Sequence, residues 1–432
     1  MANKLINWYF AENTKDYSKN EFRSAILLSA IIAFIFNSLP PHFSYSGLQI
    51  EGSEGNAANQ LFWLSMSAIA LLIAFTDGQQ QEARRLPNVL IASIPLVALC
   101  LFCVLSSAWS LVPSISLRRA TLQMMIMFCV VIATTSLKRP EHAFLIVYRV
   151  ANIVLFFEFI MLFNPQGFDE AGLFRGIHIH KNVLGLIAII STFFGVWLRY
   201  NANGTFKSVT NLFFIVSWIF FLILSFSKTS MGLAFAAPII SFGSLGICRR
   251  LGIGLGPLLA IGLSGVFMVF CVLTIAGVDV IDELVKVVKE ISFTGRDYIW
   301  NFIFIKMRGN WLGGYGFGGF WDIGPQSPSV RYGSFIAGLN QAHNGYLDLL
   351  LNIGMTGAIL YFGCIAYFLY LLDKFKNAAP GIVSICWLIL VFSLLHNFTE
   401  TTILRSYTSL WIVQLMAASV LIRLKADQGK VK

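Results

Sequence analysis

The chain has 432 residues, of which 57% are hydrophobic and only 12% are charged, and its mean hydropathy is +0.73. This composition excludes an ordinary soluble globular domain and predicts a polytopic membrane protein. The apolar residues form continuous runs and do not alternate with polar ones, which favours helices over a membrane β-barrel. The net charge of +10 does not indicate a nucleic-acid partner, because the basic residues are scattered and form no stripe with interleaved aromatic residues.

The apolar runs predict an all-α protein with about twelve transmembrane helices, since about 20 apolar residues cross a bilayer. We expect the first run to be a retained span, because no small-residue cleavage site follows it. The runs fall at 24–39, 59–76, 88–108, 120–136, 143–163, 183–198, 209–226, 229–247, 251–276, 346–372, 380–395 and 406–423.

Lys and Arg residues predict the orientation of these helices. If the N-terminus is cytoplasmic, every connection on the inside is basic, as the positive-inside rule expects, and both termini are cytoplasmic. The long segment between the ninth and tenth spans then lies on the outer side. The expected divisions are a cytoplasmic segment 1–23, transmembrane helices 1–9 over 24–276, a large periplasmic loop 277–345, transmembrane helices 10–12 over 346–423 and a cytoplasmic tail 424–432.

The predicted outer loop contains helical and glycine-rich stretches. Residues 278–291 have apolar side chains at helical spacing, and residues 297–307 predict a second, aromatic-rich helix. The run "GNWLGGYGFGGFW" follows, but no strand precedes it and no Gly-Lys-Ser/Thr comes after it, so a nucleotide-binding loop is not supported. We expect this run to form a flexible loop over a site.

Several cations on the outer side are not required by the positive-inside rule. Ionisable groups at a membrane boundary are costly and invite a functional hypothesis, although a single basic residue can also extend to the lipid headgroups. These cations are Arg118, Arg119, Arg175, Lys181, Lys228, Arg296, Lys306, Arg308, Arg331 and Arg405.

The stretch "RGIHIHKNVLG" places Arg175, His178, His180, Lys181 and Asn182 directly before an apolar run. Arg and Lys with neutral-capable His suit a diphosphate, because Arg binds phosphate oxygens with a planar fork and Lys adds a point charge. If Asn182 caps the following helix, the helix N-terminus adds partial positive charge. The two His at i, i+2 could instead bind a metal, but no nearby Asp, Glu or Cys set completes a coordination shell.

Two other stretches contribute candidate site residues. "QAHNGYLDLLLNIG" places His343 and Asn344 just before a span, where His343 could take a proton from a sugar hydroxyl or could be a structural His. "TGRDYIW" places Arg296 at the start of a helix. Lys228, in "LSFSKTSMG", is a possible supporting residue.

The seven Cys residues fall in or beside apolar runs and have no polar flanks. We interpret them as buried small hydrophobic side chains, not as a zinc site. No metal or other cofactor is predicted.

Five stretches in order resemble the O-antigen ligase and polymerase superfamily, with the closest likeness to its exopolysaccharide-polymerase (ExoQ-like) branch. The likeness extends over about residues 105–360. Each stretch alone is unspecific, whereas the ordered set is specific. The stretches are "LSSAWSLVPSISLRRA", "FRGIHIHKNVLG", "LSFSKTSMG", "TGRDYIW" and "AHNGYLDLLLNIGMTG".

This resemblance implies a metal-independent, inverting glycosyltransferase of the bacterial inner membrane with a periplasmic active site. It implies a glycan donor on undecaprenyl diphosphate, Arg175 and Arg296 as diphosphate ligands and His343 as the base; Lys181, His180 and Asn182 belong to the matched motif with less defined roles. We expect polymerisation of repeat units into exopolysaccharide or O-antigen. The alternatives are ligation of the glycan to lipid A core or protein and, from another class, transport, although the spans carry few charges besides Arg149 and Glu158.

The expected partners follow from this reaction. They are the lipid-linked donor, a glycan or lipid A core acceptor, membrane lipids, and flippase and chain-length or export proteins.

Overall fold

A computed structural model describes residues 19–36, 57–77, 85–201, 209–276 and 296–428. These residues fold into helices joined by loops, and their only β-type pairing is an isolated bridge between Phe168 and Phe174. The expected all-α membrane fold is confirmed. The helices are α2 (Lys19–Ile35), α3 (Ala57–Asp77), α4 (Arg85–Ala92), α5 (Ile94–Leu105), α6 (Pro113–Thr135), α7 (His142–Met161), α8 (Lys181–Asn201), α9 (Val209–Leu224), α10 (Lys228–Leu251), α11 (Leu255–Ile275), α13 (Arg296–Met307), α14 (Pro328–Tyr332), α15 (Gly345–Phe375), α16 (Pro380–His396) and α17 (Ser409–Gln428).

Each predicted apolar run coincides with one of these helices or with a bent pair of them. Among the described residues, eight helices are long and apolar enough to cross a membrane, and a ninth span results if α4 and the segment Ile94–Trp109, bent by 64°, cross together. Helices α9 and α16 are shorter and apolar. The total of about twelve spans stays a prediction, and the expected helix at 278–291 lies outside the described residues.

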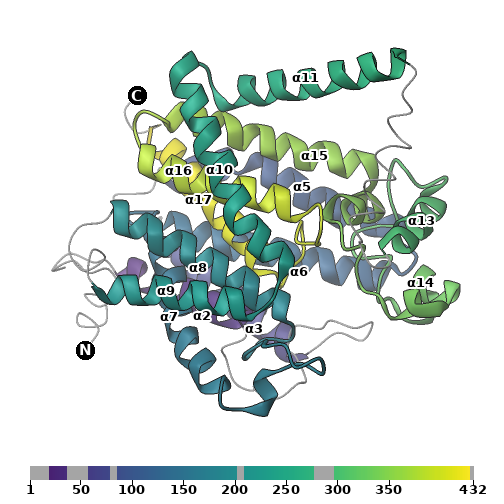
Figure 1. The fold of residues 1–432 in the computed structure, drawn as a ribbon, viewed down its shortest axis with the longest axis horizontal. Coiled ribbons are helices and arrows are strands. Elements are labelled where there is room, and N and C mark those ends of the chain that lie inside the picture. Colours follow the sequence, from purple (N-terminus) through teal and green to yellow (C-terminus); the bar gives the residue numbers. More distant parts are fainter. Residues whose placement is uncertain (1–18, 37–56, 78–84, 202–208, 277–295, 429–432) are drawn as a thin grey trace.

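Helix α17 forms the centre of the bundle (Figure 1), where α4, α6, α15 and α16 pack around it. Its span is 89% buried, which explains why its sequence is apolar on all sides and shows no amphipathic stripe. The buried side chain of Arg423 near its end donates from Nη1 to the carbonyl oxygens of Thr135 and Leu137, and from Nε to Asp427.

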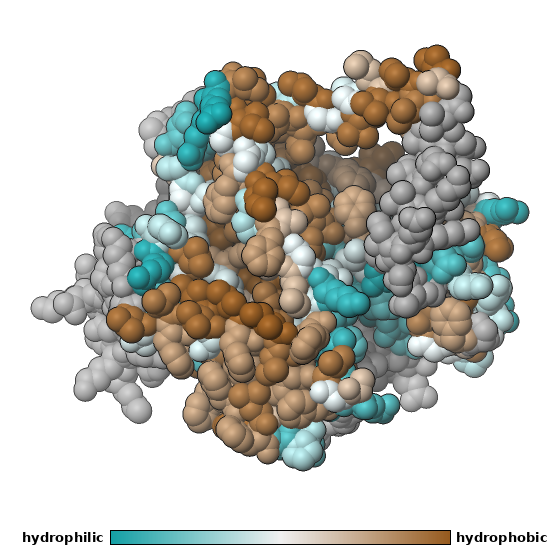
Figure 2. Space-filling view, viewed as in Figure 1, coloured by the Kyte–Doolittle hydropathy of each residue, from teal (hydrophilic) through white to brown (hydrophobic). Residues whose placement is uncertain are grey.

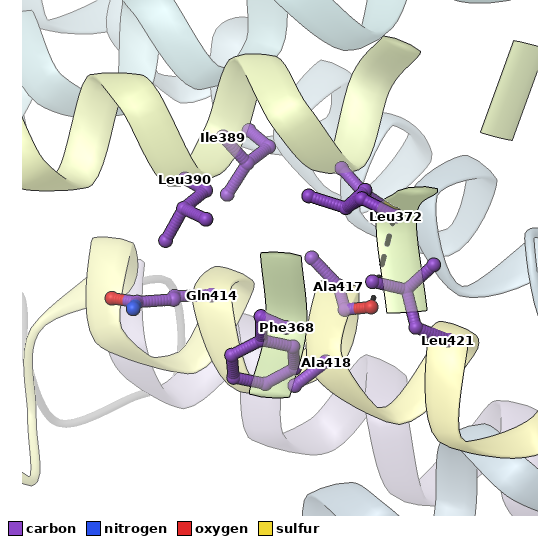
Figure 3. A pocket seen from close by; sticks show the side chains of 9 residues that line it. Phe368, Leu372, Ile389, Leu390, Gln414, Ala417, Ala418 and Leu421 are labelled. Carbon is purple, nitrogen blue, oxygen red and sulfur yellow. Dashed lines mark hydrogen bonds between the residues drawn. The ribbon is translucent and has the colours of Figure 1, made fainter. Parts of the chain in front are cut away.

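A small pocket between α15, α16 and α17 is lined almost entirely by apolar side chains (Figure 3). Gln414 is the polar residue in its wall, and its Oε1 accepts a hydrogen bond from Ser393 Oγ at 2.6 Å. The pocket lies inside the bundle, away from the polar cluster described below. All seven Cys thiols are free and all but Cys271 are buried, in agreement with their interpretation as small hydrophobic residues.

Helix α11 stands beside the bundle and not within it (Figure 1), and none of its apolar span is buried. Figure 2 shows its surface as an almost continuous hydrophobic rod. Its first turn is fixed to α15, because Asp373 Oδ1 and Oδ2 accept the N–H groups of Leu255 and Gly256 at 2.7 and 3.2 Å.

The glycine-rich run between α13 and α14 packs into a kink of α15 instead of forming a free loop. Gly354, with φ of 63° in the middle of α15, opens the helix backbone. Tyr315 N then donates to Leu351 O, and Met355 N donates to Trp311 O, both at 2.7 Å. A Cβ on Gly354 would lie 2.3 Å from Leu312 O, so the close approach requires glycine.

Arg119 of α6 holds the same run from its other side. Its guanidinium donates to the carbonyl oxygens of Gly318, Trp321 and Asp322 at 2.6 to 3.0 Å. The expectation of a flexible loop is therefore wrong for this segment, because hydrogen bonds to two helices fix its backbone. Arg119, one of the unexplained outer cations, has a structural role.

Candidate functional site

His343 is the last but one residue before α15 and has a strained backbone, with φ of 51°. The next residue, Asn344, caps the helix: its Oδ1 accepts the N–H groups of Tyr346 and Leu347 at 3.0 and 3.1 Å. Gly345 N donates to Asn397 O at 2.8 Å, which ties this turn to the loop between α16 and α17. Asn344 therefore positions His343 through the backbone.

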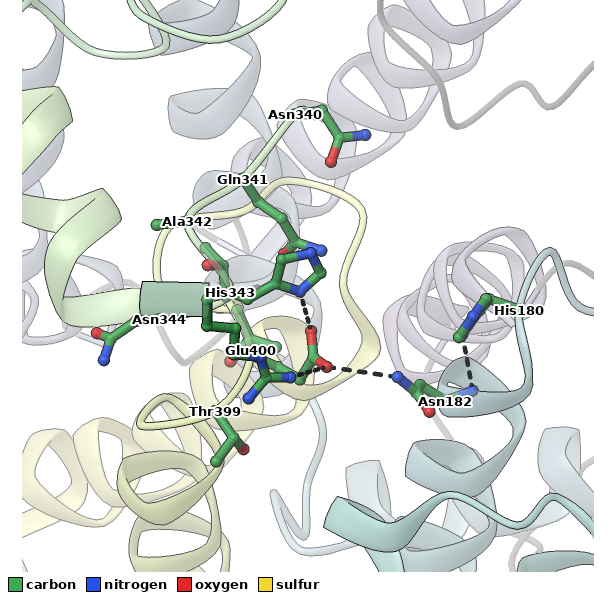
Figure 4. A network of polar contacts seen from close by, with 12 residues as sticks. His180, Asn182, Asn340, Gln341, Ala342, His343, Asn344, Thr399 and Glu400 are labelled. Carbon is green, nitrogen blue, oxygen red and sulfur yellow. Dashed lines mark hydrogen bonds and ion pairs between the residues drawn. The ribbon is translucent and has the colours of Figure 1, made fainter. Parts of the chain in front are cut away.

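Glu400, in the loop between α16 and α17, joins three residues from separate parts of the chain (Figure 4). Its Oε2 lies 3.1 Å from His343 Nδ1. Its Oε1 lies 3.3 Å from Arg296 Nη2 and accepts from Asn182 Nδ2 at 3.4 Å. The structure thus brings Arg296, His343 and Asn182 together, as the motifs predicted, around a carboxylate that they did not include.

The contacts of Glu400 determine its charge and the state of His343. Burial raises the pKa of Glu400, but the hydrogen bond from His343 and the positive charges of His343, Arg296 and His396 outweigh it, so the pKa lies below its ordinary value. An ionised carboxylate only accepts hydrogen bonds, so His343 carries its proton on Nδ1. The opposite nitrogen, Nε2, is then free to accept a proton.

His180, and not Asn182, is the residue that caps α8. His180 Nδ1 accepts the N–H of Asn182 at 3.2 Å, and its carbonyl oxygen accepts the N–H of Val183 at 3.0 Å. Asn182 lies in the first turn, where its side chain reaches Glu400, so its expected role as cap is wrong. Burial and the nearby Lys181 charge lower the pKa of His180, although Glu400 and Asp169 oppose the shift.

His178 is separated from this cluster although it is only two residues from His180. Its Nε2 lies 3.0 Å from Oε1 of Glu158 in α7, and both side chains are fully buried. Gly176, with φ of 61°, packs on the same carboxylate, where a Cβ would lie 1.6 Å from Oε2. His178 therefore anchors the loop, while the side chain of His180 stays exposed.

This separation bears on the metal alternative for the two histidines. They do not converge, and no group of three His, Cys, Asp or Glu side chains in the described ranges is arranged to hold a metal ion.

The other predicted cations flank the cluster. Arg175 donates from Nη1 to Ile179 O at 3.4 Å and from Nη2 to Gln166 O at 3.2 Å, so its guanidinium lies within its own loop, beside His180. Lys181 begins α8. Lys228 is exposed at the start of α10, a helix that packs against α8 where Gly185 meets Ser227 and Ser230.

Sequence reasoning missed Glu400 because it considered only cations on the outer side. A signal was present: Glu400 is a lone acidic residue in a short polar connection between two apolar runs, "HNFTETT". An acidic residue at such a boundary is as unusual as a basic one.

Comparison with known protein families gives one match. The family described as O-antigen ligase matches residues 212–362. This confirms the O-antigen ligase and polymerase superfamily. The matched O-antigen ligase stretch contains Arg296 and His343, whereas Arg175, Asn182 and Glu400 lie outside it. No curated protein matches the chain.

Membership of the superfamily fixes the coarse function. The chain is a multi-pass membrane protein with a glycan-processing role as ligase or polymerase, and the reaction is of the glycosyltransferase type. The family indicates lipid-linked glycans as substrates.

Proposed function

We propose that the chain polymerises repeat units carried on undecaprenyl diphosphate into an exopolysaccharide or O-antigen chain. The observation that carries this proposal is the cluster of His343, Glu400 and Arg296, which places a base, its carboxylate partner and a cation within hydrogen-bond distance. Such a set suits transfer from a donor with an anionic leaving group to a neutral hydroxyl.

In the proposed reaction His343 is the general base. Its Nε2 takes the proton of the acceptor hydroxyl while the hydroxyl oxygen bonds to the anomeric carbon of the donor sugar. Glu400, 3.1 Å from Nδ1, orients the imidazole and stabilises the positive charge that His343 gains. Glu400 is therefore a positioning residue in this scheme.

The cations bind the leaving group. As the bond between the anomeric carbon and the phosphate oxygen breaks, its electron pair leaves with undecaprenyl diphosphate. Arg296, Arg175 and Lys181 stabilise this charge in the place of a metal ion, because fixed cations act strongly in a partly dry site. A single displacement of this kind inverts the anomeric carbon. No cofactor takes part.

The polar side chains beyond the base suit a carbohydrate acceptor. Arg405 Nη1 donates to Gln341 Oε1 at 2.7 Å, and Arg405 Nη2 donates to Asn340 Oδ1 at 3.3 Å. Both amides immediately precede Ala342 and His343 (Figure 4). Sugar hydroxyls can replace either partner in such contacts.

We propose an inner-membrane location, with this site on the periplasmic side and both termini in the cytoplasm. The basic connections at the opposite ends of the helices support this orientation. The flippase that delivers the donor and the chain-length or export proteins are the partners that the reaction needs. The likeness of the motifs to the ExoQ-like branch supports polymerisation, and ligation to lipid A core or protein uses the same donor chemistry.

The length of the glycan made in the native host tests this function. Strains carrying His343→Ala or Arg175→Ala are compared with the parent strain. Loss of long chains, with single units still attached to their carrier, supports polymerisation, whereas long chains left on undecaprenyl diphosphate support ligation. Unchanged glycan in both strains would contradict the catalytic assignment.

A further inference from the structure

The two exposed histidines of the cluster are held through the same ring nitrogen but in opposite ways. His343 Nδ1 faces the ionised carboxylate of Glu400, which can only accept, so Nδ1 carries the proton. His180 Nδ1 faces the N–H of Asn182 at 3.2 Å, which can only donate, so Nδ1 carries none. A neutral imidazole has one N–H, and the hydrogen bond of one nitrogen determines the state of the other.

The two rings therefore present opposite groups to the cluster. His343 offers the lone pair of Nε2, and His180 offers the Nε2–H. A lone pair accepts a proton from a hydroxyl, whereas an N–H donates to an anion. The chain thus contains one basic and one donating imidazole, attached to the starts of two different helices, α15 and α8.

We propose that His180 is a neutral N–H donor that binds an oxygen of the donor's diphosphate through Nε2. This inference rests on the proposed function and adds a binding residue to it. Lys181 and the N-terminus of α8 adjoin His180, and Arg175 donates to the carbonyl of the preceding residue, Ile179. Each favours an anion at this position.

The surrounding charges agree with a neutral His180. Glu400 and Asp169 favour the charged ring, while Lys181, His343 and burial favour the neutral ring, and the net effect lowers the pKa below its ordinary value. His180 then stays neutral throughout the range in which His343 must be unprotonated. The two histidines do not compete for the acceptor proton.

Two substitutions separate the donor role from the capping role. His180→Asn retains a cap, because an Asn side-chain oxygen accepts a first-turn N–H, but its amide is too short to reach the position of Nε2. His180→Gln can place an amide N–H near that position but loses the cap geometry. A residue that only caps α8 predicts that Asn works better, and a phosphate ligand predicts that Gln works better.

Purified wild-type protein and both variants are compared for binding of undecaprenyl diphosphate and for glycan transfer. We expect His180→Asn to keep the thermal stability of the wild type but to bind undecaprenyl diphosphate and turn over about ten- to a hundredfold less well. His180→Gln should be closer to wild type in binding, with lower thermal stability. Wild-type binding by His180→Asn, or equal loss in both variants, would overturn the proposal.

Nitrogen-15 spectra of protein labelled at histidine test the tautomers without any activity measurement. His180→Gln and His343→Gln samples assign the signals. We expect an unprotonated Nδ1 for His180 and a protonated Nδ1 for His343. The same tautomer for both would overturn this inference even if the protein transfers glycan, whereas opposite tautomers in a protein that transfers none would contradict only the proposed function.

Discussion

Glu400 Oε2 lies 3.1 Å from His343 Nδ1, although 57 residues and two long helices separate them in the chain. The loop that carries Glu400 is built around buried Asn397, whose Oδ1 accepts the N–H groups of Thr402 and Ile403. The carbonyl oxygen of Asn397 accepts from Gly345, next to the His343 turn. The loop and the turn are therefore positioned as one unit.

Replacing Glu400 with Gln should slow glycan transfer by about a hundredfold or more, because His343 loses the acceptor that fixes its tautomer and orientation. Turnover with purified donor measures this effect. Thr399→Ala is the matched control, since Thr399 Oγ1 donates to His396 O and the residue adjoins Glu400. Equal rates for Glu400→Gln and wild type would show that His343 needs no carboxylate.

The pH dependence of stability should reveal the same carboxylate. The pKa of Glu400 in the folded protein lies below its ordinary value of 4.5, so its ion pairs stabilise the fold above pH 4.5 and this contribution is lost as the pH falls through the folded pKa. His343, Arg296 and His396 are the groups that face it. Thermal unfolding in detergent should show a gap between wild type and Glu400→Gln that closes on acidification. A gap that widens would reverse the assigned sign.

Gly176→Ala should destabilise the protein by about 3 kcal/mol or more, because the new Cβ would collide with the Glu158 carboxylate and the residue has a positive φ. Gly172→Ala isolates the second effect: Gly172 also has a positive φ, of 75°, but nothing lies within 4 Å of its added Cβ. We expect about 1 kcal/mol for that control. Similar unfolding temperatures for the two variants would mean that the contact with Glu158 is unimportant.

Arg119→Lys should loosen the glycine-rich run, because an ammonium group cannot satisfy three carbonyl oxygens in the geometry of a guanidinium fork. Hydrogen exchange should accelerate at residues 315–322 and stay unchanged in α8. Arg331→Ala is a suitable comparison, since exposed Arg331 makes a single donation from Nε, to Pro325 O at 3.4 Å. Unchanged exchange at residues 315–322 would show that α15 alone holds the run.

The sequence predicted the helices well because burial in lipid and in a helix bundle both select long apolar runs. It also located Arg296 and His343, since a charged or titratable residue beside such a run is conspicuous. It could not predict the partner of His343, because that contact depends on how α15 and α16 pack. The kink at Gly354 was likewise hidden, as a glycine inside an apolar helix has several possible uses.

The stretch 175–182 illustrates the same limit. Its composition predicted a site for an anion, but two His at i, i+2 give no indication of which one faces the bundle. Packing decides this: His178 pairs with Glu158 of α7, and His180 caps α8. Residue type could therefore indicate the chemistry of the stretch, while the separate roles of its members follow from contacts between helices.

The central claim is that the His343 cluster transfers glycan from undecaprenyl diphosphate, and reconstitution tests it most directly. Purified protein in liposomes is given a defined undecaprenyl-diphosphate-linked repeat unit, and both glycan length and released undecaprenyl diphosphate are measured for wild type and His343→Ala. We predict that the wild type forms longer glycans and releases one undecaprenyl diphosphate for each linkage, while His343→Ala forms none above background. Chain growth by His343→Ala at the wild-type rate would contradict the account.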